Sequence, residues 1–360
     1  MTAKRIVQAV SSMFKGMWIR HQLTLGLLVA ATFSSRRLTV TTLGRFLATR
    51  TAPKHAIKRV DRFLSSRFFD DRAARESYLR TVIGPRTRIV VAVDWTKIRQ
   101  WPVLCAGLCC RGRCVPLLWA VCDPQKLHKS QNAFEHGFLS WLAASLPPGV
   151  EATVLLDRGF NRVELLGQLK KLGLHVVLRT GGTVHIHSEP YSGPLQGLIE
   201  HVGASCDLRE VSLRPRRPVT SRLVGIWAPG CKEPWLLLTD LELPPARIIA
   251  LYQRRFAIEE TFRDQKNGRL GLCLGETLCK RAQRMERLLL VAALAHLLAM
   301  LVGLRARQQG LDRLYRANTV KRVATHSDFV LGLYFIFRLG IPPRATLRSF
   351  YETEVDTWRG

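Results

Sequence analysis

Two apolar stretches, each with an acid near its end, constrain the fold of this chain more than any other feature. Residues 88–96 (RIVVAVDWT) are rich in β-branched side chains and predict a buried strand that carries Asp94 near its C-terminal end. Residues 152–160 (ATVLLDRGF) repeat the arrangement with Asp157. A carboxylate in such a run has to be paired, hydrogen-bonded or metal-bound, because burying it alone is costly.

Further strands and helices are predicted around these two acids. Residues 101–122 supply two strands that turn at 111–113. An amphipathic helix at 130–145 precedes the second acidic stretch, and a helix at 163–172 and a strand at 175–179 follow it. Strands that alternate with helices and end in acids predict an α/β fold with a site at one edge of the sheet.

The N-terminal region, residues 1–84, is predicted to be helical and basic. Within residues 54–64 (KHAIKRVDRFL), three apolar residues at positions 57, 60 and 64 form the stripe of an amphipathic helix. Four cations surround this stripe: Lys54, Lys58, Arg59 and Arg62. The pattern suits a helical module that presents cations to DNA phosphates, and it equally suits a helix with an ordinary solvated face.

The second half of the chain changes character. Residues 183–245 are rich in Pro, Gly, Arg and β-forming residues, which predicts a β-rich insertion with strands at 223–227 and 235–239. Residues 288–304 (LLLVAALAHLLAMLVGL) are apolar but shorter than the about 20 residues of a membrane span, and they contain His296. A buried core helix is therefore favoured over a membrane anchor. The remainder, to Gly360, is polar, basic and of mixed character.

Residues 251–266 (LYQRRFAIEETFRDQK) contain no Gly or Pro and predict one helix. At about 100° per residue, four polar side chains share an arc of roughly 60°: Tyr252, Arg255, Glu259 and Lys266. Cationic side chains hold phosphate oxygens, and a carboxylate binds a hard divalent cation. The face therefore suits a metal ion gripping a phosphate backbone; the alternative is a solvated face with intrahelical salt bridges.

The charge of the chain points to a polyanionic partner. The 360 residues include 55 Lys and Arg against 27 Asp and Glu, a net charge of +28 that exceeds what solubility needs. The basic residues are spread along the chain, which favours extended contact with nucleic acid over a tethered basic arm; an anionic membrane surface is the competing partner. Five of the nine cysteines lie in residues 105–122, without the paired spacing of a zinc site, so reduced thiols in a cytoplasm are expected.

Asp94, Asp157 and Glu259 together form a candidate catalytic set. Two-metal phosphoryl transfer needs carboxylates that converge on cations about 3.5–4 Å apart. Each acid alone has an ordinary structural explanation, and it is their combination with the basic charge that favours catalysis.

The spacing Y-x2-R-x3-E-x6-K over residues 252–266 resembles the YREK signature of the DDE transposases of bacterial insertion-sequence family four. Asp94 in VDWT and Asp157 in DRGF match the first two acids of that family in context. The chain is most similar to the hairpin-forming, cut-and-paste branch that includes the tetracycline-resistance transposon. The likeness extends from about residue 38 to about residue 318 and includes the segments LGRFL, DWTKIR, KEPWLLLTDL and IEETFRD.

This resemblance implies an RNase H-like core in which Asp94, Asp157 and Glu259 hold two Mg2+ ions, with Mn2+ able to substitute. It implies nicking at the element end, attack of the freed 3′ hydroxyl on the opposite strand to form a hairpin, and strand transfer. The partners are double-stranded DNA, as inverted-repeat ends and target, and a second copy of the chain in a synaptic homodimer. The bacterial cytoplasm (nucleoid) is the expected location, and no membrane is expected.

The resemblance also assigns DNA contacts. Tyr252, Arg255 and Lys266 are expected to hold phosphates near the terminal nucleotides. Trp235 in KEPW matches a tryptophan that supports a flipped base during hairpin formation; on chemistry alone, a core tryptophan is the alternative. Arg158, directly after Asp157, is expected to contact DNA, with a bystander as the alternative.

Five regions are expected. They are a helical DNA-binding region at 1–84, the first core part at 85–182, the β-rich insertion at 183–245, the second core part with the YREK helix at 246–305, and a helical C-terminal region with a role in dimerisation at 306–360. Two other functions stay open: a metal-dependent nuclease or recombinase without strand transfer, and a catalytically silent, transposase-derived DNA-binding protein.

Overall fold

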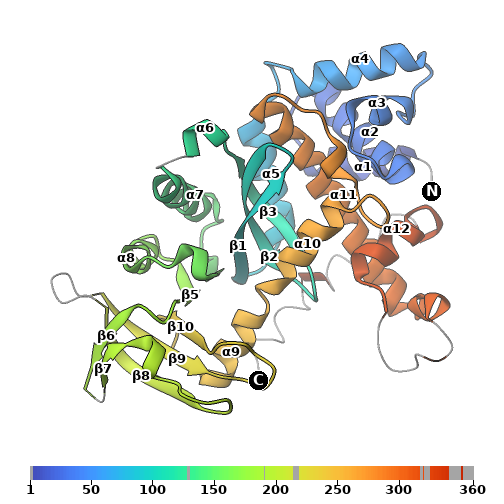
Figure 1. The fold of residues 1–360 in the computed structure, drawn as a ribbon. Coiled ribbons are helices and arrows are strands. Elements are labelled where there is room, and N and C mark those ends of the chain that lie inside the picture. The colour runs from blue at the N-terminus through green and yellow to red at the C-terminus, as the bar shows by residue number, and fades with distance from the viewer. Residues whose placement is uncertain are drawn as a thin grey trace.

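The strand that carries Asp94, β1 (Arg88–Ile98), lies within a ten-stranded sheet, and its residues 89–93 are all buried. The computed structural model describes residues 3–127, 130–189, 191–213, 219–316, 319, 325–339 and 350–351. In these ranges the sheet is combined with helices in a mixed α/β fold (Figure 1). The predicted α/β class is therefore confirmed.

The strands follow the order β3-β2-β1-β4-β5-β10-β9-β8-β6-β7. β4 is parallel to both β1 and β5, and the other neighbouring pairs are antiparallel. The strands of the first core part are β2 (Trp101–Cys109), β3 (Cys114–Val121), β4 (Glu151–Leu156) and β5 (His175–Arg179). Each agrees with a strand predicted from the sequence. The turn between β2 and β3 contains Gly112 at φ 68°, a left-handed conformation that glycine adopts without strain.

The predicted insertion is built of strands that continue this sheet. They are β6 (His185–Ser188), β7 (Tyr191–Pro194), β8 (Ser205–Ser212), β9 (Thr220–Ile226) and β10 (Trp235–Thr239). β10 pairs directly with β5, with Leu238 opposite Leu178. The described part of residues 183–245 thus contains five strands, and the hydrogen-bonded ladder runs from β5 into this region without a break.

Five helices form the N-terminal region, as the sequence predicts: α1 (Ala3–Met13), α2 (Ile19–Ser35), α3 (Val40–Arg45), α4 (Pro53–Leu64) and α5 (Asp71–Ile83). The hydroxyl of Thr39 caps α3 by accepting from the backbone N–H of Thr42 at 3.2 Å. α3 and α4 pack very closely at Gly44, where a Cβ atom would lie 2.5 Å from the Cα of Ile57. Figure 1 shows this region at the opposite end of the molecule from β6–β8.

The remaining helices surround the core. They are α6 (Pro124–Leu127), α7 (Gln131–Ser145), α8 (Val163–Lys171), α9 (Pro245–Gln253), α10 (Phe256–Lys266), α11 (Ala282–Gln308) and α12 (Asp328–Leu339). By length and composition alone, α11 could cross a membrane. However, 94% of its most apolar 18-residue stretch is buried inside the structure. This is the burial of a core helix, as the sequence predicts.

α12 corrects the prediction that the C-terminal segment is merely polar and of mixed character. Eight of its residues are buried, and it packs against α11. The two backbones approach so closely that a Cβ at Gly303 would lie 1.6 Å from the carbonyl oxygen of Asp328. Parts of the expected dimerisation region at 306–360 lie outside the described residues.

Candidate active site

The register of two parallel strands places Asp94 and Asp157 side by side. Val93 of β1 is the partner of Leu156 of β4, and each acid is the next residue in its chain. Asp94 is still within β1, whereas Asp157 follows the end of β4 and caps the short 3-10 helix at 158–160 by accepting from the N–H of Gly159 at 2.8 Å. The two acids therefore lie at the C-terminal ends of neighbouring parallel strands.

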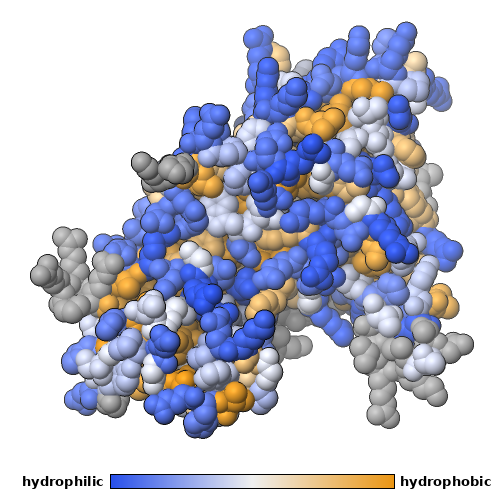
Figure 2. Space-filling view, in the orientation of Figure 1, coloured by the Kyte–Doolittle hydropathy of each residue, from blue (hydrophilic) through white to orange (hydrophobic). Residues whose placement is uncertain are grey.

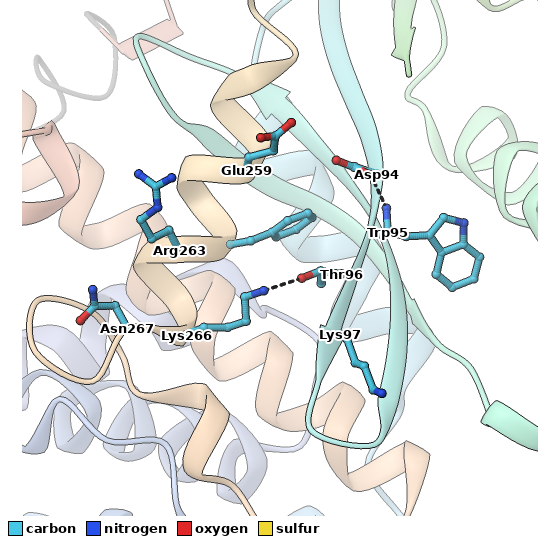
Figure 3. A pocket seen from close by; sticks show the side chains of 9 residues that line it. Asp94, Trp95, Thr96, Lys97, Glu259, Arg263, Lys266 and Asn267 are labelled. Atoms are coloured by element: carbon cyan, nitrogen blue, oxygen red, sulfur yellow. Dashed lines mark hydrogen bonds between the residues drawn. The ribbon is translucent and has the colours of Figure 1, made fainter. Parts of the chain in front are cut away.

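Glu259 reaches the same place from α10. Figure 3 shows its carboxylate facing that of Asp94 across a cleft between α10 and β1. The cleft has a volume of about 590 Å3 and its lining includes both acids, Thr96 and Lys266. Nζ of Lys266 donates to the Thr96 hydroxyl at 3.0 Å, so the expected phosphate-binding lysine lies at the cleft.

The single helix predicted over 251–266 is wrong in one respect. The chain forms α9 and α10 with a turn at Arg254 and Arg255 between them. There the backbone N–H groups bond three residues back instead of four, as in Arg255 to Tyr252 at 3.0 Å. The sequence pattern does not reveal this turn, because arginine is a good helix former and both residues have helical dihedral angles.

Arg255 lies directly between two of the acids. Its Nη1 donates to Oδ2 of Asp94 at 3.2 Å and its Nη2 donates to Oε1 of Glu259 at 2.6 Å. Arg255 is 6% exposed, so an expected DNA contact is buried among the expected metal ligands. Its guanidinium also lies 4.7 Å from the centre of the Phe256 ring.

The pKa of Asp94 reflects its burial and the charged groups around it. Burial, together with the negative charges of Asp157 and Glu259, raises the pKa of Asp94 to about 6, while Arg255 and the backbone N–H of Trp95 act in the opposite direction. The negative charge of this site is thus only partly compensated by the residues around it. A site of this kind favours a bound cation.

A divalent metal fits this site by its donor chemistry. Carboxylate oxygens are the ligands that Mg2+ prefers. Here the carboxylates of Asp94 and Glu259 pair with one guanidinium, and Asp157 adds a third negative charge close to Asp94. As the side chains stand, no group of three His, Cys, Asp or Glu within the described ranges is close enough to hold a metal ion. Arg255 lies between Asp94 and Glu259 and forms an ion pair with each.

Three aromatic side chains pack together next to Arg255. Trp235, the first residue of β10, packs edge-to-face on Tyr252 with ring centres 5.2 Å apart, and lies 5.9 Å from Phe256. Tyr252 is 0% exposed, and burial raises the pKa of its hydroxyl, so the side chain lies beneath the surface expected to meet phosphates. Phe256 is 38% exposed and was not singled out by sequence reasoning.

Arg158 forms an ion pair on the insertion side of the site. Its Nη1 donates to both carboxylate oxygens of Glu233 at 3.1 Å, and Arg179 reaches the same carboxylate at 2.8 Å. Glu233 lies two residues before Trp235, in the KEPW segment. Sequence reasoning missed Glu233 and Arg179 because the pairing joins segments that are far apart in the chain.

The four cations predicted on α4 divide into two kinds. Lys54, Lys58 and Arg62 are exposed. Arg59 is half-buried and donates to the hydroxyl of Thr24 on α2 at 2.9 Å, so it ties two helices together. Figure 2 shows hydrophilic side chains over this end of the molecule.

The cysteine cluster has the features of buried thiols. All nine cysteines are free, and the Sγ atoms of Cys109 and Cys114 lie 3.7 Å apart across β2 and β3. Burial raises the pKa of the Cys105 thiol to about 12, which disfavours the thiolate that zinc requires. The expectation of thiols over zinc agrees with this environment.

Comparison with known proteins finds a match to one protein family. A family model described as a transposase DDE domain matches residues 85–298, more than half of the chain. The matched segment begins just before β1 and includes Asp94, Asp157 and Glu259. No curated protein matches the chain.

Proposed function

Because the chain belongs to the family of transposases with a DDE domain, we propose that it excises a bacterial insertion sequence and inserts it elsewhere by cut and paste. Membership of the family makes it a transposase that carries out phosphoryl transfer on DNA. We propose in addition a hairpin intermediate, two metal ions and roles for individual residues.

One observation carries the proposal: Asp94 and Asp157 lie at the ends of register-matched parallel strands, and Glu259 on α10 faces Asp94 across an open cleft. The strand order β3-β2-β1-β4-β5, with only β1, β4 and β5 parallel, supports an RNase H-like core. In this proposal residues 183–245 interrupt the core, residues 1–84 bind DNA, and residues 306–360 contribute to dimerisation.

Asp94, Asp157 and Glu259 would hold two Mg2+ ions, and Mn2+ would substitute. When bound, such cations supply charge that activates an attacking oxygen and stabilises a leaving one. The chain's own contribution is to hold three deprotonated carboxylates in place. Until DNA and cations bind, the Arg255 guanidinium compensates the negative charge of Asp94 at 3.2 Å and of Glu259 at 2.6 Å.

Water first attacks the phosphodiester at the element end, and its P–O bond to the 3′ oxygen breaks. The freed 3′ hydroxyl then attacks a phosphodiester of the opposite strand, and the P–O bond to the 3′ oxygen of the flanking DNA breaks, so that a hairpin forms and the flanking DNA leaves. Hydrolysis opens the hairpin, and the resulting 3′ hydroxyl attacks a phosphodiester of the target DNA, from which a 3′ oxygen leaves. Lys266 at the cleft, and Arg255 once released, hold phosphate oxygens by charge-assisted hydrogen bonds. Trp235 and Phe256 offer aromatic surface to a base pulled from the stack.

The partners in this proposal are the two inverted-repeat ends, target DNA and a second copy of the chain, in the bacterial cytoplasm (nucleoid). The exposed cations Lys54, Lys58 and Arg62 on α4 support contact with the DNA backbone. A net charge of +28 supports the same conclusion.

A catalytically silent DNA-binding protein is the second candidate. The observation that favours it is the Arg255 guanidinium, which lies where a cation would lie between Asp94 and Glu259. The two candidates differ in metal-dependent cleavage, because a silent protein binds DNA without cutting it.

The test is cleavage of a short duplex from the DNA that flanks this gene, with Mg2+ or with EDTA. Wild type is compared with Asp94→Asn and Glu259→Gln on a denaturing gel, on which a hairpin runs as a strand of double length. Metal-dependent nicks and hairpins that both variants lose are expected. Binding without cleavage by the wild type would favour the silent candidate, and nicks without hairpins would favour a nuclease without strand transfer.

A further inference from the structure

Glu135 on α7 is a fully buried acid that lies just outside the three-acid set. It is 0% exposed, and a carboxylate buried alone is costly. Its Oε1 accepts from the indole Nε1 of Trp95 at 2.8 Å and from Nε2 of Gln131 at 2.9 Å, and its Oε2 accepts from Nη1 of Arg162 at 2.5 Å. Both oxygens are therefore satisfied, one of them by a cation.

Each arm of this network leads to one of the acids. Trp95 follows Asp94 directly, and its backbone N–H donates to Oδ1 of Asp94 at 2.7 Å. Arg162 lies at the end of the short segment that begins with Asp157, immediately before α8. One buried carboxylate thus links the chain after the first acid to the chain after the second.

The Trp95 side chain is well suited to transmit this restraint. Figure 3 shows its indole pointing away from the Asp94 carboxylate. The ring also packs against Phe134 of α7 at 5.5 Å between centres. Packing and the indole hydrogen bond together fix the peptide that presents its N–H to Asp94.

Building on the proposed function, we propose that Glu135 is a positioning residue that fixes Asp94 and Asp157 relative to each other for cation binding. Groups that share a metal ion have to be held to within about 0.5 Å, and the partners of metal ligands supply that precision. Glu135 contributes the restraint without touching the cleft, whose lining does not include it.

Glu135→Gln tests the proposal because the amide still accepts from Trp95 but leaves Arg162 without its counter-charge. The half-saturation concentration of Mn2+, measured by calorimetric titration of the full chain without DNA, is expected to rise by about 10- to 100-fold. The kcat for nicking is expected to fall by a similar factor, while the KM for the duplex stays unchanged.

Glu151→Gln is the matched control. Glu151 is the first residue of β4 and pairs with Arg88 of β1 at 2.9 Å, so it joins the same two strands at their other ends. Both side chains are exposed, at 57% and 59%. Its replacement is expected to leave Mn2+ half-saturation and kcat at the wild-type values.

Equal Mn2+ half-saturation in wild type and Glu135→Gln, accompanied by a lower melting temperature, would overturn the positioning role and leave a structural one. Trp95→Phe keeps an aromatic side chain but removes the indole N–H donor; it is expected to raise Mn2+ half-saturation too, and it decides the matter if Glu135→Gln does not fold. A wild type that binds no Mn2+ would instead overturn the proposed function, so the two failures are distinguishable.

Discussion

Nη1 of Arg255 donates to Oδ2 of Asp94 at 3.2 Å, so an expected DNA contact neutralises an expected metal ligand. The same guanidinium extends to Glu259. In the proposed function, metal and DNA would therefore depend on this side chain in opposite ways: a cation would have to displace it from the acids, whereas a phosphate would gain from its charge.

Arg255→Gln is expected to bind Mn2+ more tightly and DNA more weakly than wild type. A hydrogen bond to a charged group contributes about 1.5–3 kcal/mol, so its loss is expected to change each affinity by about 10- to 100-fold. Calorimetry measures the metal, and fluorescence anisotropy measures a labelled duplex in EDTA. Arg88→Gln removes an exposed arginine from β1 and serves as the control. If Arg255→Gln bound both Mn2+ and DNA more weakly than wild type, the result would contradict the idea that a cation displaces Arg255 from the acids.

The free energy of unfolding of the metal-free protein is expected to decrease as the pH rises, because of Asp94. Its pKa is raised from 3.8 to about 6, so the folded state binds this proton more tightly than the unfolded chain. At about 1.36 kcal/mol per pKa unit, the free energy of unfolding loses up to about 3 kcal/mol as the pH rises through this interval.

Asp94→Asn is therefore expected to be more stable than wild type at neutral pH, and equally stable below the ordinary pKa of the acid. Urea unfolding of both proteins in EDTA, at several pH values, measures the difference. A constant difference across the range would show that Asp94 does not titrate as proposed.

Trp235→Ala is expected to slow hairpin formation and leave the first nick unaffected. Aromatic stacking on a base contributes about 1–3 kcal/mol, which corresponds to roughly a 10- to 100-fold slower step. A denaturing gel separates nicked from hairpin product over time. Trp227→Ala, in the same region but bonded to the carbonyl of Cys231 at 3.0 Å, is the control. Equal slowing of both products would argue for a purely structural tryptophan.

Glu233→Gln is expected to increase DNA affinity by releasing Arg158 and Arg179 from their shared carboxylate. Each additional phosphate contact makes the salt dependence steeper by about 0.9 in a plot of log affinity against log salt. Anisotropy titrations at several salt concentrations give this slope. Glu242→Gln removes an exposed acid that pairs with Arg209 and is the comparison. An unchanged slope would mean that neither arginine reaches phosphate.

Gly303→Ala is expected to destabilise the protein, because the new methyl group would collide with the backbone of α12 at Asp328. Overpacking of this kind costs about 1–3 kcal/mol. Gly137→Ala on α7 meets open space and is expected to stabilise by about 0.5–1 kcal/mol. Thermal unfolding of both variants measures the contrast. A tolerated Gly303→Ala would mean that α11 and α12 can separate.

The sequence predicted the features that depend on local pattern. β1, β4 and β5 are runs of apolar residues, and the placement of Asp94 and Asp157 follows from parallel pairing. The turn at Arg254 and Arg255 was not predictable from periodicity, because it changes hydrogen bonding without a helix-breaking residue. The burial of Tyr252 was missed for another reason: its partner Trp235 belongs to a different element.

Contacts between distant segments account for the other misses. The pairing of Arg255 with Asp94 joins residues 161 positions apart, and Glu135 meets Arg162 from another helix. α12 was overlooked because it is a short apolar stretch among basic residues, and only its packing on α11 distinguishes it. A single sequence carries no signal for such pairings.

The continuous ladder from β1 through β4 and β5 to β10 makes the insertion and the acids parts of one rigid object. Three steps between strands, at about 4.8 Å each, separate the backbone of β1 from that of β10, which begins with Trp235. A tryptophan on a hinged domain would sample many separations from the acids. Here the sheet fixes the separation between Trp235 and the acids. A DNA end that contacts both Trp235 and the acids therefore has to adapt its own conformation to that separation.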